Sequence, residues 1–330
     1  MRLKALVLVA AAVFATASVA AGQEWAPPRT ADGHPDLQGV WANNNVTPLQ
    51  RPEILGDRET LTDEEVAALQ ARAGDLFNDA AGDAAFGDSV FAAALAEAES
   101  FSSRDRATGN YNHFWMVERD WDNRTSLIVD PPDGRLPART EAADARAAAR
   151  AEARARHAWG PEDRSLGERC ISWGAPRLGA GYNSYLQIFQ SANHVVLYQE
   201  MGGPRVISLT GAPHVDDSVR LLHGDSRGHW DGDTLVVETT NYAAEASVAG
   251  SAGEKLHVLE RFTRAGDDVL RYEVTVTDPD TWAAPWTAMI PLRFTTEPVF
   301  EYACHEGNIG MEGIMAGARV LERAEAEGGQ

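Results

Sequence analysis

The sequence predicts a mainly β fold, an antiparallel β-barrel or barrel-like sheet with an N-terminal arm and a few peripheral helices. Short strand-like runs follow one another from about residue 182 to about 305, with turn residues between them, a spacing typical of a barrel or sandwich. Asp231-Gly232 joins two of these runs, which is a strong hairpin signal. None of the runs alternates with a helix, so strand–helix–strand units are not expected.

Residues 1 to about 21 are predicted to form a secretory signal peptide. A positive start at Arg2 and Lys4 precedes an apolar run over 5–17, and small residues follow at Ala20 and Ala21. The run is shorter than the roughly 20 apolar residues that a membrane helix needs, so no membrane insertion is expected. The mature chain is therefore predicted to be periplasmic or secreted.

The first half of the mature chain is predicted to surround the sheet. Residues 22–61 are rich in Pro, Gly, Asn and Asp, which indicates an extended arm with one short strand at 37–41. Residues 62–160 are predicted to be a helical and mixed segment packed on the sheet. Its helices are expected at 62–78, which Thr62 and Glu65 open with a capping box, at 89–99, and at 140–158 before Gly160-Pro161.

The antiparallel β domain is predicted over 161–310, and the C-terminal tail over 311–330 contains a short helix at 318–327. Apolar and β-branched runs bounded by turn residues mark the strands. The expected strands are 186–190, 194–200, 205–209, 219–222, 228–230, 234–240, 256–263, 269–277, 287–294 and 299–304.

Charge and cysteine content limit the partners and the compartment. The chain of 330 residues has a formal net charge of −20, which argues against nucleic acid because phosphate backbones require a basic surface. Its two cysteines, Cys170 and Cys304, are predicted to form a disulfide in an oxidising compartment. The alternative is a Cys304 nucleophile beside His305, which the exported location makes the less favoured one.

Candidate catalytic residues lie on strands with apolar faces. No Gly-x-Ser-x-Gly, His-Glu-x-x-His, Walker or dinucleotide motif occurs in the sequence. Glu260 alternates with Val258 and Phe262, and the same alternation places Glu238 beside Val236. A carboxylate on an apolar face must be paired or its pKa rises, and a raised pKa suits a general acid or base.

The predicted acid–base group is Glu260, His257 and Asp225, with Arg227 orienting them. The alternative role for Glu260 is an internal salt bridge with Arg227 or Arg261, since structural ion pairs also perturb pKa values.

Aromatic and histidine residues supply the candidate binding groups. Aromatic side chains line apolar pockets or fill a core, and both roles remain open here. No cofactor is predicted. The histidine spacing matches no standard zinc pattern, and a metal held by His214, His223 and His257 is kept as an alternative. The candidate substrate-binding residues are Tyr198, Trp230, Tyr272, Trp282 and Trp286.

Two arginine-containing segments have both a structural and a binding interpretation. In the charged stretch 160–170, Arg164, Glu168 and Arg169 are expected to form a salt-bridge network that is either structural or presents arginine to an anionic ligand. The basic stripe of the helix at 140–158, with Arg150 and Arg154, is either a binding surface or a solubilising face.

Four segments give the chain a resemblance to a family of secreted bacterial proteins of uncharacterised function. They are Arg29–Trp41, Gly160–Cys170, Gly224–Asn241 and Glu301–Asn308. The resemblance covers most of the mature chain and its motifs are specific. It implies export and one continuous domain, and it carries over no catalytic role.

Together these observations predict an exported enzyme that acts on a small, largely apolar molecule by acid–base chemistry, as a hydrolase, hydratase or lyase, or isomerase. The first alternative is a periplasmic carrier of a hydrophobic or aromatic ligand. The second is a non-catalytic envelope structural protein. An open cavity with converging polar groups favours the enzyme, an aromatic-lined cavity the carrier, and a packed interior the structural protein.

Overall fold

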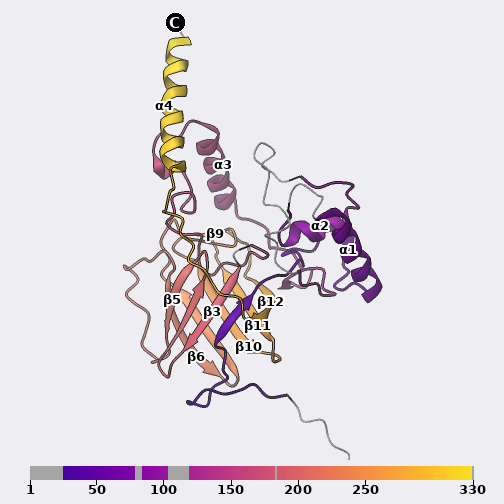
Figure 1. Ribbon diagram of the computed structural model, residues 1–330. Helices are drawn as coiled ribbons and strands as arrows, with labels where there is room; N and C mark the ends of the chain where they lie inside the picture. Colours follow the sequence, from indigo (N-terminus) through magenta and orange to yellow (C-terminus); the bar gives the residue numbers. More distant parts are fainter. Residues whose placement is uncertain (1–24, 79–83, 103–118, 183, 329–330) are drawn as a thin grey trace, which may run out of the picture.

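Nine strands close into a barrel in the computed structural model, which describes residues 25–78, 84–102, 119–182 and 184–328. The strand order is β1-β3-β4-β5-β6-β7-β10-β11-β12, and β1 pairs with both β3 and β12 to close the circle (Figure 1). Neighbours are antiparallel except β5 and β6, which are parallel. The predicted mainly β barrel is confirmed, and the predicted signal peptide lies outside the described residues.

The strand bounds follow the predicted runs closely. β2 (Ile128–Asp130) extends the sheet beside β12, and β8 (Ser247–Val248) pairs with β9 (Ser251–Ala252) in a small separate hairpin. The barrel strands are β1 (Gly39–Ala42), β3 (Tyr185–Gln190), β4 (His194–Gln199), β5 (Gly203–Ser208), β6 (Asp225–Asp231), β7 (Thr234–Thr240), β10 (His257–Arg264), β11 (Val269–Thr277) and β12 (Trp286–Thr295).

Three expectations about strands are corrected. The arm does not only pack over the sheet, because its strand β1 is part of the barrel wall. The predicted strand at 219–222 does not form, since the Asn241 side chain donates to the carbonyls of this connection, including that of Val219. The predicted strand at 299–304 is replaced by tight turns, with Cys304 N donating to Tyr302 O at 2.8 Å.

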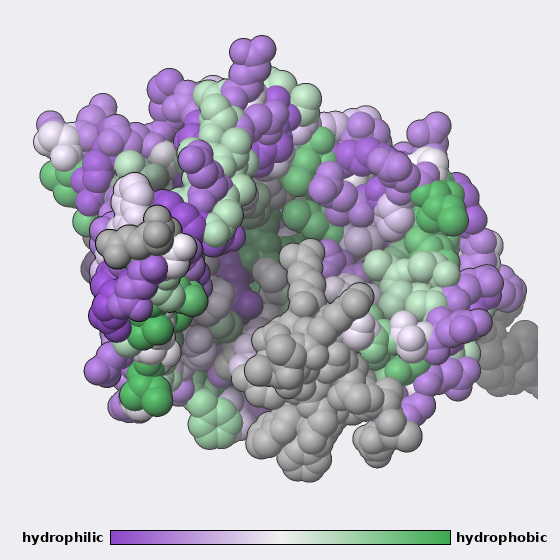
Figure 2. Space-filling model, turned by 90° about the horizontal axis from the view of Figure 1, so that it is seen from above, coloured by the Kyte–Doolittle hydropathy of each residue, from purple (hydrophilic) through white to green (hydrophobic). Residues whose placement is uncertain are grey.

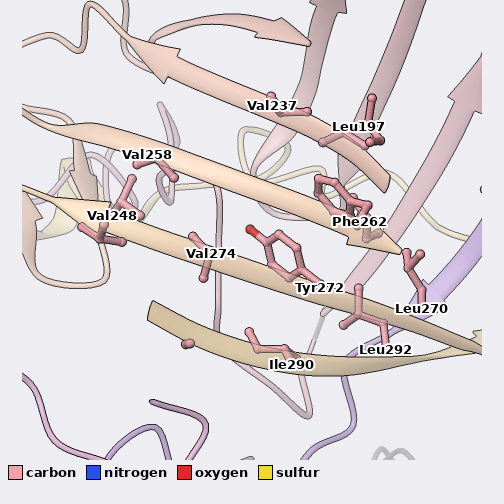
Figure 3. Packing of buried hydrophobic residues seen from close by; sticks show 14 of the residues in the cluster. Leu197, Val237, Val248, Val258, Phe262, Leu270, Tyr272, Val274, Ile290 and Leu292 are labelled. Carbon is pink, nitrogen blue, oxygen red and sulfur yellow. The ribbon is translucent and has the colours of Figure 1, made fainter. Parts of the chain in front are cut away.

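The alternation that predicted the strands also fills the barrel. Along β10, Val258, Glu260 and Phe262 are buried, and the intervening residues are less buried. Figure 3 shows inward-pointing side chains from several strands, among them Leu197, Val237 and Ile290, meeting in one cluster. Trp41, Trp286, Tyr242 and Phe262 are among the largest fully buried side chains. The lumen is therefore a packed core.

The predicted hairpin at Asp231-Gly232 is confirmed. Asp231 pairs with Thr234, which leaves Gly232 and Asp233 as a two-residue loop between β6 and β7. Gly232 has φ +57°, a left-handed conformation that costs glycine little.

The helices lie at one end of the barrel, the upper end in Figure 1. α1 (Asp63–Leu76) begins with the predicted capping box of Thr62 and Glu65, and α2 (Asp88–Leu95) packs with it in a second apolar cluster. α3 (Glu141–Ala155) is capped by Thr140 as expected. Two short 3-10 helices are η1 (Glu53–Leu55) and η3 (Pro161–Asp163). None of the helices in the described ranges is both long enough and apolar enough to cross a bilayer.

α4 (Gly310–Gly328) is longer than the predicted helix at 318–327 and projects from the body (Figure 1). The Asn308 side chain accepts a hydrogen bond from Gly310 N at 3.1 Å and so caps the start of the helix. The helix therefore begins before the residues whose apolar pattern predicted it. Arg319 anchors the helix by donating to Ala158 O at 2.7 Å and Trp159 O at 3.1 Å.

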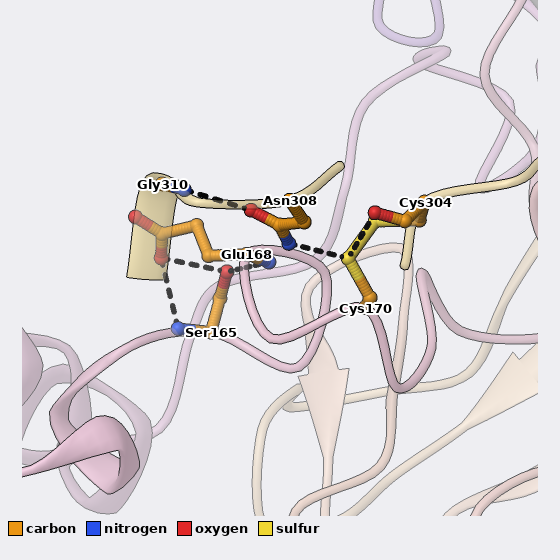
Figure 4. The surroundings of a disulfide bond; sticks show 6 residues. All are labelled: Ser165, Glu168, Cys170, Cys304, Asn308 and Gly310. Atoms are coloured by element: carbon orange, nitrogen blue, oxygen red, sulfur yellow. Dashed lines mark hydrogen bonds between the residues drawn. A yellow bond between two sulfur atoms is a disulfide. The ribbon is translucent and has the colours of Figure 1, made fainter. Parts of the chain in front are cut away.

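The predicted disulfide between Cys170 and Cys304 is present, which excludes the alternative of a free Cys304 nucleophile (Figure 4). Asn308 Nδ2 lies 2.8 Å from Cys170 Sγ. Ser165 N and Oγ both donate to one carboxylate oxygen of Glu168, at 2.9 and 2.8 Å. The bond therefore joins an ordered turn over 165–170 to the segment that leads into α4.

Candidate ligand-binding cleft

Glu260 points into the barrel and is paired there, but not with the arginines named from the sequence. Its two carboxylate oxygens accept from Arg205 Nη1 and Nη2 at 2.7 and 2.8 Å, and Tyr272 Oη donates to it at 2.8 Å. The side chains of Arg205 and Glu260 are 4% and 0% exposed. Glu260 therefore forms an internal salt bridge, as the alternative predicted, but with Arg205 rather than Arg227 or Arg261. Arg205 can reach it because β5 lies across the lumen.

This pair is enclosed in the barrel interior. Burial opposes the charge of Arg205, but the Glu260 carboxylate more than offsets burial and raises the pKa of Arg205. Burial, reinforced by Glu260, raises the pKa of Tyr272 well above its ordinary value. A nearby cavity lined by Tyr272, Ile290 and Leu292 measures only about 20 Å³, roughly room for one water.

The other predicted catalytic residues lie together on the outer face of the barrel wall. Asp225 accepts from Arg227 at 2.9 Å and lies 2.8 Å from His214 Nδ1. Glu238 lies 2.7 Å from His257 Nε2 and 3.7 Å from His214 Nε2. Glu238 shares a face of β7 with Val236 as predicted, but that face is the outer one and Glu238 is half exposed. The structure therefore brings Asp225, Arg227 and His257 into one outer cluster and leaves Glu260 on the opposite face of the sheet.

The outer cluster gives a pH prediction. The hydrogen bond from His257 is the main cause that lowers the pKa of Glu238, so the ionised carboxylate stabilises the fold above its unfolded pKa. We expect Glu238→Gln to lower the free energy of unfolding by less than about 1 kcal/mol at pH 6 because the pair is solvated. The difference should vanish as the pH falls through the lowered pKa of Glu238. Urea unfolding of both proteins across this range measures it, and a pH-independent difference would contradict it.

The metal alternative finds no support in the geometry. His214 and His257 flank Glu238, but His223 lies elsewhere, 2.8 Å from Ser172 Oγ. Burial, and secondarily Arg205, lowers the pKa of His223. Within the described ranges, no group of three or more His, Cys, Asp or Glu side chains is arranged to hold a metal ion.

Most of the five predicted substrate-binding aromatics belong to the barrel core or pack against it. Tyr272 and Trp286 are core residues, and Trp282 is also buried, donating to Ser251 Oγ at 2.7 Å. Trp230 stacks on His34 at the end of the barrel away from the helices, with ring centroids 4.7 Å apart. Tyr198 belongs to the outward-facing set of β4. Three of the five therefore fill the core instead of lining a pocket.

A large hollow lies at the helix-bearing end of the barrel. One groove of about 600 Å³ runs between α3, residues 162–174 and residues 245–249. A second, of about 400 Å³, runs between residues 45–49, the start of α2 and residues 173–180. Trp173, Ser247 and Ala249 line both grooves, which we treat as one end cleft. Seen from above, the molecule is hollowed between the side with α3 and α4 and the side with α1 and α2 (Figure 2).

The two halves of the end cleft differ in chemistry. Arginines border the larger half, which we call the arginine half, and apolar side chains dominate the smaller, apolar half. The arginine half is lined by Arg150, Arg154, Arg164 and Arg169 together with Glu162, Asp163 and Glu245. The apolar half is lined by Leu49, Phe86, Leu127, Trp173, Pro176 and Leu178 with a few polar residues.

Local constraints place Trp173 at the junction of the two halves. A Cβ on Gly167 would lie 2.9 Å from the Trp173 ring, so the ring packs directly on the glycine backbone. Gly174 has φ +84°, and a Cβ there would lie 2.3 Å from Ser247 O. Tyr302 meets the Trp173 ring edge-on, with centroids 6.5 Å apart. Trp173 as a residue is nevertheless 45% exposed and lines both grooves.

Barrel side chains fix the strip that follows Trp173. Gln199 exchanges two hydrogen bonds of 2.9 Å with the backbone of Arg177, and Asn43 Nδ2 donates to Leu178 O at 3.2 Å. Asn45, fully buried at the wall of the apolar half, donates to Pro291 O at 2.9 Å. Its Oδ1 has no hydrogen-bond partner in the described part of the chain. The apolar half thus has a rigid wall and one spare acceptor.

The arginine network expected at 160–170 forms only in part. Arg164 lies 3.9 Å from a Glu168 oxygen, at the outer limit of an ion pair. Arg169 makes no ion pair with any described residue. Asp163 is instead bound by both terminal nitrogens of Arg156, at 2.7 and 2.9 Å.

The residues that line the apolar half were not singled out from the sequence. Leu49, Leu127 and Leu178 come from irregular segments far apart in the chain, so no periodic pattern joins them. The available signal was Trp173 itself, three residues after a cysteine predicted to be bridged and followed by Gly174.

The chain matches no protein family, no curated protein and no solved structure. The resemblance to secreted bacterial proteins therefore stays a prediction.

Proposed function

We propose that the protein is an exported carrier that binds a small hydrophobic or aromatic molecule in the end cleft. The observation that carries this proposal is the contrast between a filled barrel and an open cleft of about 400 Å³ with apolar walls. Small-molecule sites are concave, mostly apolar and roughly 300–1,000 Å³ in volume, with a few polar groups that orient the ligand.

Export is supported by the predicted signal peptide and by the disulfide. Bonds of this kind persist in oxidising compartments such as the periplasm.

The acid–base enzyme is the less supported function. Glu260 is held by Arg205 and Tyr272 inside the core, and neither His257, Asp225 nor Arg227 lines the end cleft. The proposed general acid and the proposed ligand site are therefore in different places. The structural-protein alternative explains the packed lumen but not an exposed tryptophan at the junction of two grooves.

Binding of N-phenylnaphthylamine, a neutral aromatic probe whose fluorescence rises in apolar surroundings, tests the proposal. We expect saturable one-site binding to the oxidised protein. Trp173→Ala should weaken it by about tenfold, because an aromatic contact plus its buried area is worth roughly 1.4 kcal/mol.

Trp159→Ala is the matched control, since Trp159 is 70% exposed and lines neither groove. Thermal unfolding of each variant establishes that it is folded. The carrier proposal fails if the probe does not saturate, or if the two tryptophan variants bind it equally well.

A further inference from the structure

Two arginines of α3, Arg150 and Arg154, face the end cleft without an ion pair to any described residue. Arg146, Arg150 and Arg154 are spaced four residues apart and so lie on one face of the helix, where like charges repel. Arg146 is held by Asp280 O and Thr281 Oγ1, both at 2.9 Å. Arg150 and Arg154 have no ion pair or side-chain hydrogen bond among the described residues. Both are exposed to the groove, so their charge is available to a ligand.

The other charged groups of the arginine half compensate this charge only in part. Arg164 and Arg169 lie on the neighbouring wall. Of the carboxylates there, Asp163 is engaged by Arg156, while Glu162 and Glu245 form no ion pair in the described part of the chain.

Four guanidinium groups, of which Arg164 lies 3.9 Å from a Glu168 oxygen, and two carboxylates with no ion pair to a described residue therefore border one groove of a chain whose net charge is −20. Apolar walls strengthen the field of such a group of charges.

We propose that the ligand is an organic anion, whose carboxylate, sulfonate or phosphate group binds Arg150 and Arg154 while its apolar body lies on Trp173. This inference rests on the proposed carrier function and names the class of its ligand. Guanidinium groups bind such oxyanions through paired N–H donors. Trp173 lines the same groove as both arginines, so one molecule can contact all three.

A matched pair of probes separates the anionic group from the apolar body. Anilinonaphthalene sulfonate carries the same rings as N-phenylnaphthylamine plus one sulfonate. We expect the sulfonate probe to bind at least about tenfold more tightly, as charge-assisted hydrogen bonds predict, and its affinity to fall with added salt. The double variant Arg150→Gln/Arg154→Gln should remove this advantage, because it lowers the affinity for the sulfonate probe by a larger factor than the affinity for the neutral probe.

Arg323→Gln is the control, because Arg323 is an exposed arginine of α4 that lines neither groove. If the sulfonate probe is not preferred, or its preference survives the double variant, the anion inference is overturned and the carrier proposal stands. If neither probe saturates, the carrier proposal itself fails and the inference falls with it. Circular dichroism checks that the double variant retains its helices.

Discussion

Glu260→Gln is expected to lower the free energy of unfolding by about 3–5 kcal/mol, since it leaves Arg205 charged and unpaired in the core. Water cannot solvate the guanidinium group in place of Glu260, because the Arg205 side chain is only 4% exposed. Arg205 Nε already lacks a hydrogen-bond partner among the described residues, so no other acceptor there can replace the lost carboxylate oxygen. Urea unfolding at neutral pH, followed by tryptophan fluorescence, measures the loss.

A second variant separates the charge from the packing. Replacing both partners, as Arg205→Met/Glu260→Leu, should restore most of the stability, because apolar replacement of a buried pair is often neutral or stabilising. Glu238→Gln removes a carboxylate from the outer face of the same sheet and is the control. A folded Glu260→Gln protein as stable as the wild type would show that the pair is not buried in solution. Binding of the neutral probe by that protein would further separate Glu260 from the ligand site.

Local patterns were sufficient to predict that Glu260 faces the interior. Alternation with Val258 and Phe262 is a property of one strand and needs no knowledge of its neighbours. Its partner could not be predicted in the same way. Arg205 also alternates with a buried residue, Ile207, but which strands face each other across the lumen depends on how the barrel closes. The closure depends on β1, a strand of four residues within a segment that otherwise resembles a loop.

The residues that line the end cleft could not be predicted from the sequence for a related reason. Periodicity identifies residues that share a helix or strand face, whereas Leu49, Phe86 and Leu178 meet only because three irregular segments cross the end of the barrel. The arginines of α3 were recognisable as a stripe, because helical spacing is local. That the stripe faces a groove, rather than open solvent, depends on the position of residues 245–249.

Loss of the disulfide, as Cys170→Ala/Cys304→Ala, is the other large effect expected. The cysteines are 134 residues apart in the sequence, and the chain-entropy model assigns a loop of that length on the order of 4–5 kcal/mol. Few contacts beyond the disulfide hold the segment that precedes α4, since Phe300 and Ile309 are 69% and 76% exposed. Removing the bond frees this segment in the native state too, so we expect a loss nearer about 2–4 kcal/mol, the typical measured range.

The same double variant should also weaken binding of the neutral probe. Trp173 contacts Tyr302, two residues before Cys304, and packs on Gly167, three residues before Cys170, so the bond joins both supports of the ring. Arg319→Gln is the matched comparison, because it loosens α4 from Ala158 and Trp159 and leaves the disulfide intact. We expect probe affinity to fall by about tenfold in the cysteine variant and to stay unchanged in Arg319→Gln. Equal affinities in the two variants would mean that the bond stabilises the chain without positioning the end cleft.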